Sequence, residues 1–321
     1  MRALITGGAG FIGSHLADHL LDAGHSVIAL DDLSTGRHTN IEHLLGRPDF
    51  EFVLGSILNP DVVDDVVGRC EAVFHLAAAV GVKLIVEEPL RSLATNIRGS
   101  EIVFEKANKY GTRVLVTSSS EIYGKNRSDR LGEDDDRILG SPLKSRWAYS
   151  EAKAIDEILA YTYWREKGLP TVIVRLFNTV GPRQTGSYGM VIPRFVAQAL
   201  RHEPITVYGD GAQTRCFCYV GETVEALAAL VDHPDAYGRV FNLGADDEVS
   251  MAALAELIRE QSGSRSKIRY VPYEEVYEEG FEDMARRVPD TTRARDLVGF
   301  RPTVGLRDII RLVIEEQSAA L

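Results

Sequence analysis

Tyr149 and Lys153 have the residue types and the spacing that proton transfer requires. They are four positions apart, which places them one above the other on the face of a helix. A free phenol has a pKa of about 10, too high for a base at neutral pH. A neighbouring ammonium favours the phenolate and is expected to lower that pKa, so that Tyr149 can take a proton from a substrate hydroxyl. An exposed pair on a helix surface has the same spacing, so the interpretation needs support from elsewhere in the chain.

A run of hydroxyl side chains gives that support. Ser119, Ser120 and Glu121 follow Arg113–Thr117, a short apolar run that is typical of a buried strand. Ligands of α/β proteins bind beyond the carboxyl ends of strands, so a serine there could share a hydrogen bond with a substrate hydroxyl and with Tyr149. A serine-rich turn without a chemical role is the plain alternative.

The amino-terminal glycines predict a dinucleotide site. They follow the apolar run Ala3–Thr6 and open a helical pattern, so they allow a tight turn, a close approach of a pyrophosphate and tight helix–strand packing. The positions expected along the cofactor here are Gly7, Gly10, Phe11, Ile12 and Gly13. Asp31 ends the next apolar run, at close to the expected separation of about 20 residues, and Asp32 follows it. A carboxylate at that place binds the ribose hydroxyls and repels a 2′-phosphate, which favours NAD over NADP.

The elements that position these residues follow from the hydrophobic pattern. Brief runs of Val, Ile and Leu alternate with amphipathic stretches, which predicts an α/β protein with a Rossmann-type doubly wound parallel sheet and a smaller C-terminal substrate domain. The expected strands are Ala3–Thr6, Ser26–Asp31, Ala72–Leu76, Arg113–Thr117 and Thr171–Leu176. The expected helices include Ile12–Ala23, Asn96–Tyr110 and Ala148–Lys167.

The alternation breaks near Asn178, which marks the expected domain boundary. Residues 1–177 are expected to form the NAD-binding domain and residues 178–321 mainly the substrate domain. Elements expected in the second half are Pro193–Leu200, Ile205–Tyr208, Val240–Leu243 and a helix from near Ser250 to about Gln261. The strand at 240–243 is expected to return to the first domain, and the acidic segment Tyr273–Asp283 to form a surface loop or a short helix.

Charge and cysteine content exclude several classes of protein. The formal net charge of −11 argues against general affinity for nucleic acid or an anionic membrane. The three cysteines lack the spacing of a disulfide framework or a zinc site, and no apolar run approaches the roughly 20 residues that a membrane span needs. We therefore expect a soluble cytoplasmic protein without a metal.

Taken in order, these motifs resemble the extended short-chain dehydrogenase/reductases, a family of NAD-dependent epimerases and dehydratases that modify nucleotide sugars. The resemblance covers nearly the whole chain. It rests on Gly7–Gly13, Phe74–Ala78, Asn96, Ser119–Gly124, Tyr149 with Lys153, Arg175–Asn178, Gly181–Arg183, Tyr208–Gly211 with Arg215, and Arg287–Asp290.

The resemblance implies roles for individual residues. Ser119 matches the family's catalytic hydroxyl, Tyr149 its base, and Lys153 the partner of that base and a ribose contact. The positions implied along NAD are Ser56, Ile57, Ala77, Ala78 and Asn96. Ser56 is a departure, because the family usually has Asp there to meet adenine. The positions implied for the nucleotide diphosphate are Asn178, Arg215 and Arg287. Arg183 and Arg287 are each candidates for the diphosphate or for a carboxylate of the sugar.

The reaction is less sharply implied than the family. Members oxidise the sugar at C4 and then diverge. Ser120 stands where many 4,6-dehydratases have an acidic residue, which disfavours that reaction, and the stretch Ser119–Gly124 is similar to that of UDP-glucuronate decarboxylases. A decarboxylase using Glu121 is therefore favoured, with a UDP-sugar 4-epimerase as the alternative. A non-catalytic NAD-binding sensor is disfavoured, because Ser119, Tyr149 and Lys153 are all present. The resemblance also implies a homodimer formed by helices 96–110 and 148–167.

Overall fold

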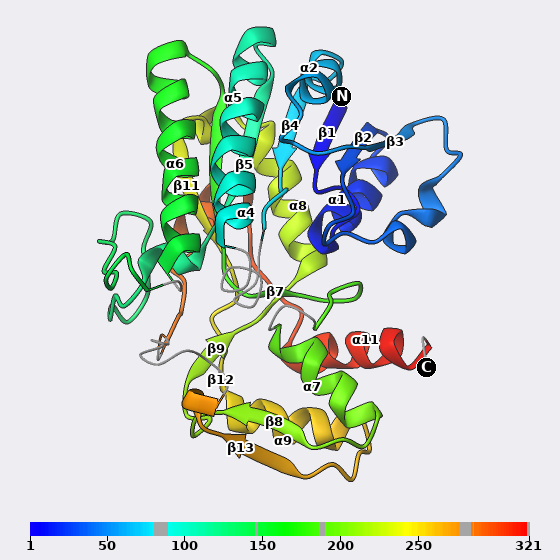
Figure 1. The fold of residues 1–321 in the computed structure, drawn as a ribbon, viewed down its shortest axis with the longest axis vertical. Helices are drawn as coiled ribbons and strands as arrows, with labels where there is room; N and C mark the ends of the chain where they lie inside the picture. The colour runs from blue at the N-terminus through cyan, green and yellow to red at the C-terminus, as the bar shows by residue number, and fades with distance from the viewer. Residues whose placement is uncertain (80–88, 145–146, 187–189, 276–283, 285, 320–321) are drawn as a thin grey trace.

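A seven-stranded parallel sheet forms the centre of the computed structural model, which describes residues 1–321 except 80–88, 145–146, 187–189, 276–283, 285 and 320–321 (Figure 1). Its strands are β1 (Arg2–Thr6), β2 (Ser26–Asp31), β3 (Phe50–Leu54), β4 (Ala72–His75), β5 (Arg113–Ser119), β6 (Thr171–Leu176) and β11 (Arg239–Leu243). The order across the sheet is β11-β6-β5-β4-β1-β2-β3. The chain runs outward from β1 in one direction and then from β4 in the other. This reversal is the place where α/β sheets open a crevice for ligands, at the carboxyl ends of β1 and β4.

The strands form because their side chains are apolar on both faces. In β6, for example, Val172, Ile173 and Val174 are at most 1% exposed, which suits a strand covered by helices on both sides. One face of the sheet is covered by the helices α1 (Phe11–Asp22) and α8 (Val220–Val231). The helix α10 (Thr292–Val298) lies beside α8 and β11. The opposite face is covered by α2 (Pro60–Gly68), α5 (Gly99–Tyr110) and α6 (Ala148–Lys167).

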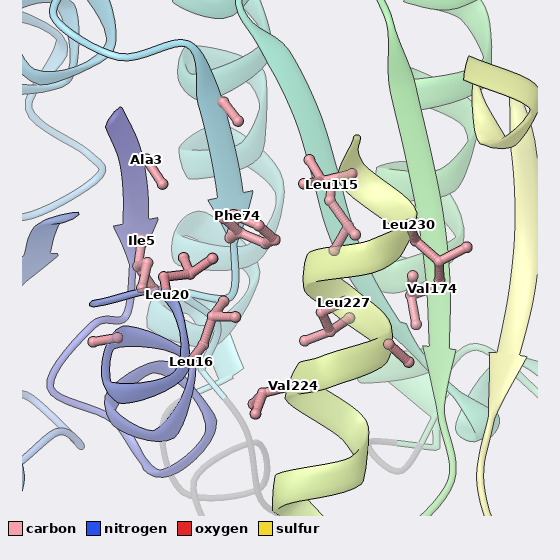
Figure 2. Close-up of a cluster of buried hydrophobic side chains, with 14 of the residues drawn as sticks. Ala3, Ile5, Leu16, Leu20, Phe74, Leu115, Val174, Val224, Leu227 and Leu230 are labelled. Atoms are coloured by element: carbon pink, nitrogen blue, oxygen red, sulfur yellow. The ribbon is translucent and has the colours of Figure 1, made fainter. Parts of the chain in front are cut away.

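Figure 2 shows how one of these faces is filled. Leu227 and Leu230 of α8 point toward Leu115 of β5 and Val174 of β6, and all four side chains are buried. Leu16 of α1 extends the same cluster toward β1 and β4. Residues 220–231 thus cover the first sheet, although they follow the expected domain boundary at 177/178.

A smaller layer beyond the carboxyl edge of the sheet has its own core (Figure 1). It contains α7 (Val191–Leu200), β8 (Ile205–Tyr208), α9 (Met251–Gln261), β13 (Ile268–Val271) and α11 (Leu306–Ala319). Within this layer β8 pairs with β13. Two further strand pairs lie between this layer and the large sheet: β9 (Thr214–Cys216) with β12 (Glu248–Ser250), and β7 (Thr179–Val180) with β10 (Cys218–Tyr219). The remaining short elements are η1 (His38–Asn40), η2 (Glu42–Leu44), α4 (Pro89–Leu93), η3 (Ala94–Arg98), η4 (Ser120–Tyr123), η6 (Pro234–Ala236) and η7 (Tyr273–Glu275).

The predicted fold class is confirmed, and the differences are local. The strand expected at 113–117 continues through Ser119, and the helix expected from Asn96 starts earlier, with a π-helical turn, η3, at 94–98. The strand at 239–243 pairs with β6 in the first sheet. Of the acidic segment 273–283, residues 273–275 form a 3₁₀ turn and 276–283 lie outside the described residues.

None of the helices in the described part of the chain combines the length and the apolar character that a bilayer crossing demands.

Candidate active site

The glycine loop between β1 and α1 has the close packing that a dinucleotide cradle requires. Gly7 has a positive φ of 74°, and a Cβ there would lie 3.0 Å from the backbone nitrogen of Ala77. A Cβ on Gly13 would collide with the carbonyl oxygen of Gly7. Phe11 and Ile12 form the first turn of α1, which carries no acidic residue. No carboxylate of the helix itself therefore offsets the positive end of the helix dipole that faces the loop.

Asp31 at the end of β2 is fixed by the same loop. Its Oδ2 accepts from the Ala9 N–H at 3.0 Å and its Oδ1 from the Leu33 N–H at 2.8 Å. Burial raises the pKa of this carboxyl, and those backbone N–H groups oppose the shift. Gly36 closes over it, since a Cβ there would lie 2.8 Å from both carboxylate oxygens. Each oxygen keeps a lone pair for a ribose hydroxyl. Asp32 is exposed and accepts from the Ser34 N–H.

The other positions expected along NAD line the adjoining strand ends. Ser56 and Ile57 follow β3; the Ser56 hydroxyl accepts from the Leu58 N–H at 3.3 Å, and Ile57 is buried. Ala77 and Ala78 follow β4. Asn96 is buried in η3, where its side chain bonds both backbone groups of Ala79, at 2.7 Å and 3.2 Å. Asn96 therefore shapes the backbone that follows β4. These close approaches and aligned N–H groups fit a bound dinucleotide.

The structure brings Ser119, Tyr149 and Lys153 together. Ser119 is the last residue of β5, and its hydroxyl accepts from the Glu121 N–H at 3.3 Å at the start of η4. A hydrogen bond from Ser119 also acts on Tyr149, which lies one turn before Lys153 on α6. Lys153 is buried, 2% exposed, and pairs with Asp156. This arrangement can pass a proton between a substrate hydroxyl and the phenol.

Opposing effects act on the pKa of Tyr149. Burial raises the pKa of Tyr149, and the charges of Glu121 and Asp156 raise it further. The Lys153 ammonium and the Ser119 hydrogen bond lower it, as expected, but burial is the largest effect. The predicted effect of the Lys153 ammonium is thus confirmed in direction, and the desolvation of the phenol, which the spacing does not show, outweighs it.

Arg287 makes an ion pair that the sequence did not reveal. Its Nη1 lies 2.6 Å from Oε1 of Glu121 and 3.2 Å from the Ser120 hydroxyl. The Arg287 Nε is buried and has no hydrogen-bond partner among the described residues. The residues that follow Arg287 are held by the Leu131 backbone, which bonds Val288 and Asp290. Arg287 thus brings a positive charge to Ser120 and Glu121, beside the catalytic residues.

Asn178 and Arg215, which are also expected at the diphosphate, have backbone partners in the structure. Asn178 has a positive φ of 36°, and its amide donates to the Cys216 carbonyl at 2.8 Å. Arg215 on β9 is buried and donates to the Thr214 carbonyl.

Arg183, the fourth candidate, is joined to α1 and α11. Its guanidinium pairs with Asp18 of α1 at 2.8 Å, and its backbone N–H donates to Glu316 of α11. That Arg183 steers a sugar carboxylate stays a prediction. Its contacts with Asp18 and Glu316 give that prediction no support.

Sequence reasoning missed two sets of buried residues around α6. Asp156 stands three residues after Lys153, and this spacing on a helix was a usable signal. Arg175 of β6 donates to both oxygens of Glu157, at 2.9 Å and 2.7 Å, and to the Tyr123 hydroxyl at 2.8 Å. No local sequence pattern indicates the contacts among Arg175, Glu157 and Tyr123, because these residues come from three different elements.

The described residues contain no group of three or more His, Cys, Asp or Glu side chains placed to hold a metal ion.

Comparison with known proteins places these residues in a family. Residues 3–244 match the model of the NAD dependent epimerase/dehydratase family. The chain is 42% identical over 315 residues to a UDP-N-acetyl-alpha-D-glucosaminuronate decarboxylase of Bacillus cytotoxicus, and the match covers 97% of both proteins. It is 37% identical over 319 residues to a UDP-glucuronic acid decarboxylase of Arabidopsis thaliana, covering 98% of this chain and 68% of that protein.

A solved structure is similar over the full length. The UDP-glucuronic acid 4-epimerase of Bacillus cereus, in complex with UDP-glucuronic acid and NAD, superposes with a TM-score of 0.90 at 27% identity, covering 100% of both chains. The relatives thus share the uronate substrate class in their names and differ in the reaction.

Asp31 gives a test of cofactor binding. Asp31→Ala removes the ribose acceptor and leaves two backbone N–H groups unpaired, so NAD binding should weaken by about 1–3 kcal/mol. Gly36→Ala should weaken it too, since the new methyl group displaces the carboxylate. Calorimetric titration with NAD and NADP measures both. Tighter binding of NADP than of NAD by the unaltered protein would contradict the assignment.

Proposed function

This chain belongs to the NAD-dependent epimerase/dehydratase family, and on that premise we propose that it decarboxylates a UDP-linked hexuronate through a transient ketone at C4. UDP-glucuronate and its 2-acetamido analogue are the two candidate substrates. The observation that carries the proposal is the Glu121–Arg287 pair beside Ser119 and Tyr149. A simple 4-epimerase needs no acid or base for the carbon that bears the carboxylate. The names of the decarboxylase relatives support the same choice.

NAD is the cofactor, and when bound it accepts the C4 hydride and later returns it. Tyr149 takes the proton of the C4 hydroxyl, with Ser119 positioned to share that hydrogen bond and Lys153 stabilising the phenolate. Oxidation at C4 makes the substrate a β-keto acid. The C5–C6 bond then breaks, its electron pair moves toward the ketone, and carbon dioxide leaves. A proton is delivered to C5, and Tyr149 returns its proton to the C4 oxygen as hydride comes back.

We assign the steps at C5 and C6 to Glu121 and Arg287. The substrate carboxylate is an anion that competes with Glu121 for the Arg287 guanidinium. Arg287 can meet it by exchanging part of its contact with Glu121, which is 20% exposed, for the incoming anion. Glu121, released in part from Arg287, becomes a less acidic carboxyl group and can manage the proton at C5.

The family's usual homodimer and a cytoplasmic location stay predictions. Exposed apolar side chains on α6, Ile158, Tyr161 and Trp164, support a subunit contact through that helix.

A substrate survey tests the proposed reaction. We expect the protein to convert one of the two UDP-hexuronates into carbon dioxide and a UDP-pentose, or the acetamido counterpart of that pentose. NMR of the sugar measures this conversion. Interconversion of the uronate with its C4 epimer, with no carbon dioxide released, would make it a uronate 4-epimerase. The absence of any turnover with NAD would favour a non-catalytic sensor.

Tyr149→Phe tests the base. This substitution keeps the ring and removes the phenol, so the rate of C4 oxidation should fall by about 100-fold or more while NAD binding survives. Reduction of bound NAD after mixing with substrate gives the rate by its absorbance. Oxidation at a near-normal rate would show that another group is the base.

Glu121→Gln tests the carboxyl group beside Arg287. It keeps the shape and removes the titratable group, so product formation should fall by about 100-fold with NAD binding retained. Glu248→Gln is the matched control, because it removes the partner of the neighbouring Arg286 at an exposed place. Equal rates for the two variants would leave Glu121 a structural residue.

A further inference from the structure

The Lys153 ammonium has a counter-ion inside the protein. Asp156 lies three residues further along α6, with its Oδ2 3.0 Å from Nζ of Lys153, and the two side chains are 0% and 3% exposed. A carboxylate in such a place costs free energy unless it is paired. Its contact with the ammonium that stabilises the Tyr149 phenolate points to a part in that chemistry, which rests on the function proposed above.

A buried row of hydrogen bonds leads to this pair from the cofactor side. Thr6 accepts from the Ala77 N–H at 3.2 Å and donates to Nδ1 of His75 at 2.8 Å. His75 Nε2 then donates to the Ser100 hydroxyl at 3.0 Å, and Ser100 donates to the Asn96 carbonyl at 2.7 Å. Burial lowers the pKa of His75 to about 3, so the ring is neutral. Each hydrogen in the row has one acceptor, which fixes the tautomer of His75.

Ser100 also lies beside Asp156, and this decides how the carboxylate is satisfied. Burial raises the pKa of Asp156, and the Lys153 ammonium and the Ser100 hydroxyl oppose that shift. The single hydrogen of Ser100 can reach Asp156 only by leaving the Asn96 carbonyl. Among the described residues, Oδ1 of Asp156 has no hydrogen-bond partner. The ammonium of Lys153 is therefore the main support of the Asp156 charge.

Two other carboxylates lie around α6, and each is paired with an arginine. Glu157 is held by Arg175 of β6, and Glu121 of η4 by Arg287. Glu121 still raises the pKa of Tyr149, and Glu157 raises the pKa of Lys153 less than Asp156 does. From β4 comes the neutral His75, and from α5 the uncharged Ser100. Asp156 is thus the carboxylate that contacts Lys153 directly and acts on both Lys153 and Tyr149.

The sign of that action is the same for both groups. A negative charge favours the protonated form of each neighbour, so Asp156 raises the pKa of Lys153 and the pKa of Tyr149. The ammonium stays charged in spite of its burial, and the phenol keeps its proton to a higher pH.

We propose that Asp156 is a positioning residue that holds the Lys153 ammonium in place from within the protein and, through its charge, sets the pH range in which Tyr149 and Lys153 exchange protons with the substrate. Removing the charge of Asp156 should therefore move the pH range of activity to lower pH. If Asp156 were only a structural contact, its removal would lower activity and leave that pH range unchanged.

Asp156→Asn is the variant that tests this, because Asn keeps the shape and can still accept from Lys153. The first readout needs no substrate. Ultraviolet titration of phenolate in the NAD-loaded protein, minus the same titration of its Tyr149→Phe counterpart, isolates one of the 12 tyrosines. We expect Tyr149 to ionise about one pH unit lower in the Asn variant than in the unaltered protein, the lower end for a lost charge at close range.

The second readout is the pH dependence of the rate at which bound NAD is reduced by the UDP-sugar. Both limbs should move to lower pH, the acid limb with Tyr149 and the basic limb with Lys153. Glu151→Gln is the matched control on the same helix, since Glu151 is half exposed and its charge is screened by solvent. Its limbs should not move.

Two further variants keep the result decisive. Asp156→Ala is a second neutral replacement, should the Asn side chain prevent folding, and it should shift Tyr149 in the same direction. Asp156→Glu keeps the charge, so both limbs of its pH profile should stay in place even where its rate differs. Unshifted titration of Tyr149 in the neutral variants would overturn the proposal. Reduction of NAD without release of carbon dioxide would contradict the proposed decarboxylation alone, because C4 oxidation still reports on Asp156.

Discussion

The Arg175 guanidinium is the buried charge on which the arrangement of the active site depends. It leaves β6 and is satisfied by both oxygens of Glu157 on α6, by the Tyr123 hydroxyl at the end of η4 and by the Glu133 carbonyl, at 2.7–2.9 Å. Breaking a buried pair of this kind typically costs about 3–5 kcal/mol, because an uncompensated charge remains. The alignment of α6 with η4 is therefore enforced, and with it the alignment of Lys153 with Ser119.

The same network reaches the C-terminal part of the chain. The Tyr123 hydroxyl donates to Asn242 on β11, and the Asn242 amide donates to the carbonyls of Leu131 and Asp290. Asp290 is three residues after Arg287, so the segment that carries Arg287 is tied to the first sheet. Arg287, which follows most elements of the smaller layer in the sequence, is thus brought back to a site built from the first sheet.

The sequence revealed what is encoded in local spacing. Gly7 to Gly13, Asp31 and the Tyr149–Lys153 pair are each fixed by positions within one turn or one strand, and the structure places them at one crevice. It could not reveal the Glu121–Arg287 pair, whose members are 166 positions apart and meet only through tertiary packing. Strand β3 was missed because it is an edge strand with alternating polar residues, Phe50-Glu51-Phe52, and lacks the continuous apolar run of the central strands. The raised pKa of Tyr149 was missed because desolvation depends on the finished fold.

The two ion pairs at the site differ in burial, and this difference separates their uses. Lys153 and Asp156 are closed off from solvent, at 3% and 0% exposure, so no substrate anion can replace the carboxylate, and its charge acts steadily on its neighbours. Arg287 and Glu121 are 9% and 20% exposed. A carboxylate with that much access to solvent can be displaced by an incoming anion at moderate desolvation cost, since the arginine keeps a partner throughout. The inner pair is thus suited to holding a proton balance constant, and the outer pair to changing it when an acidic sugar arrives.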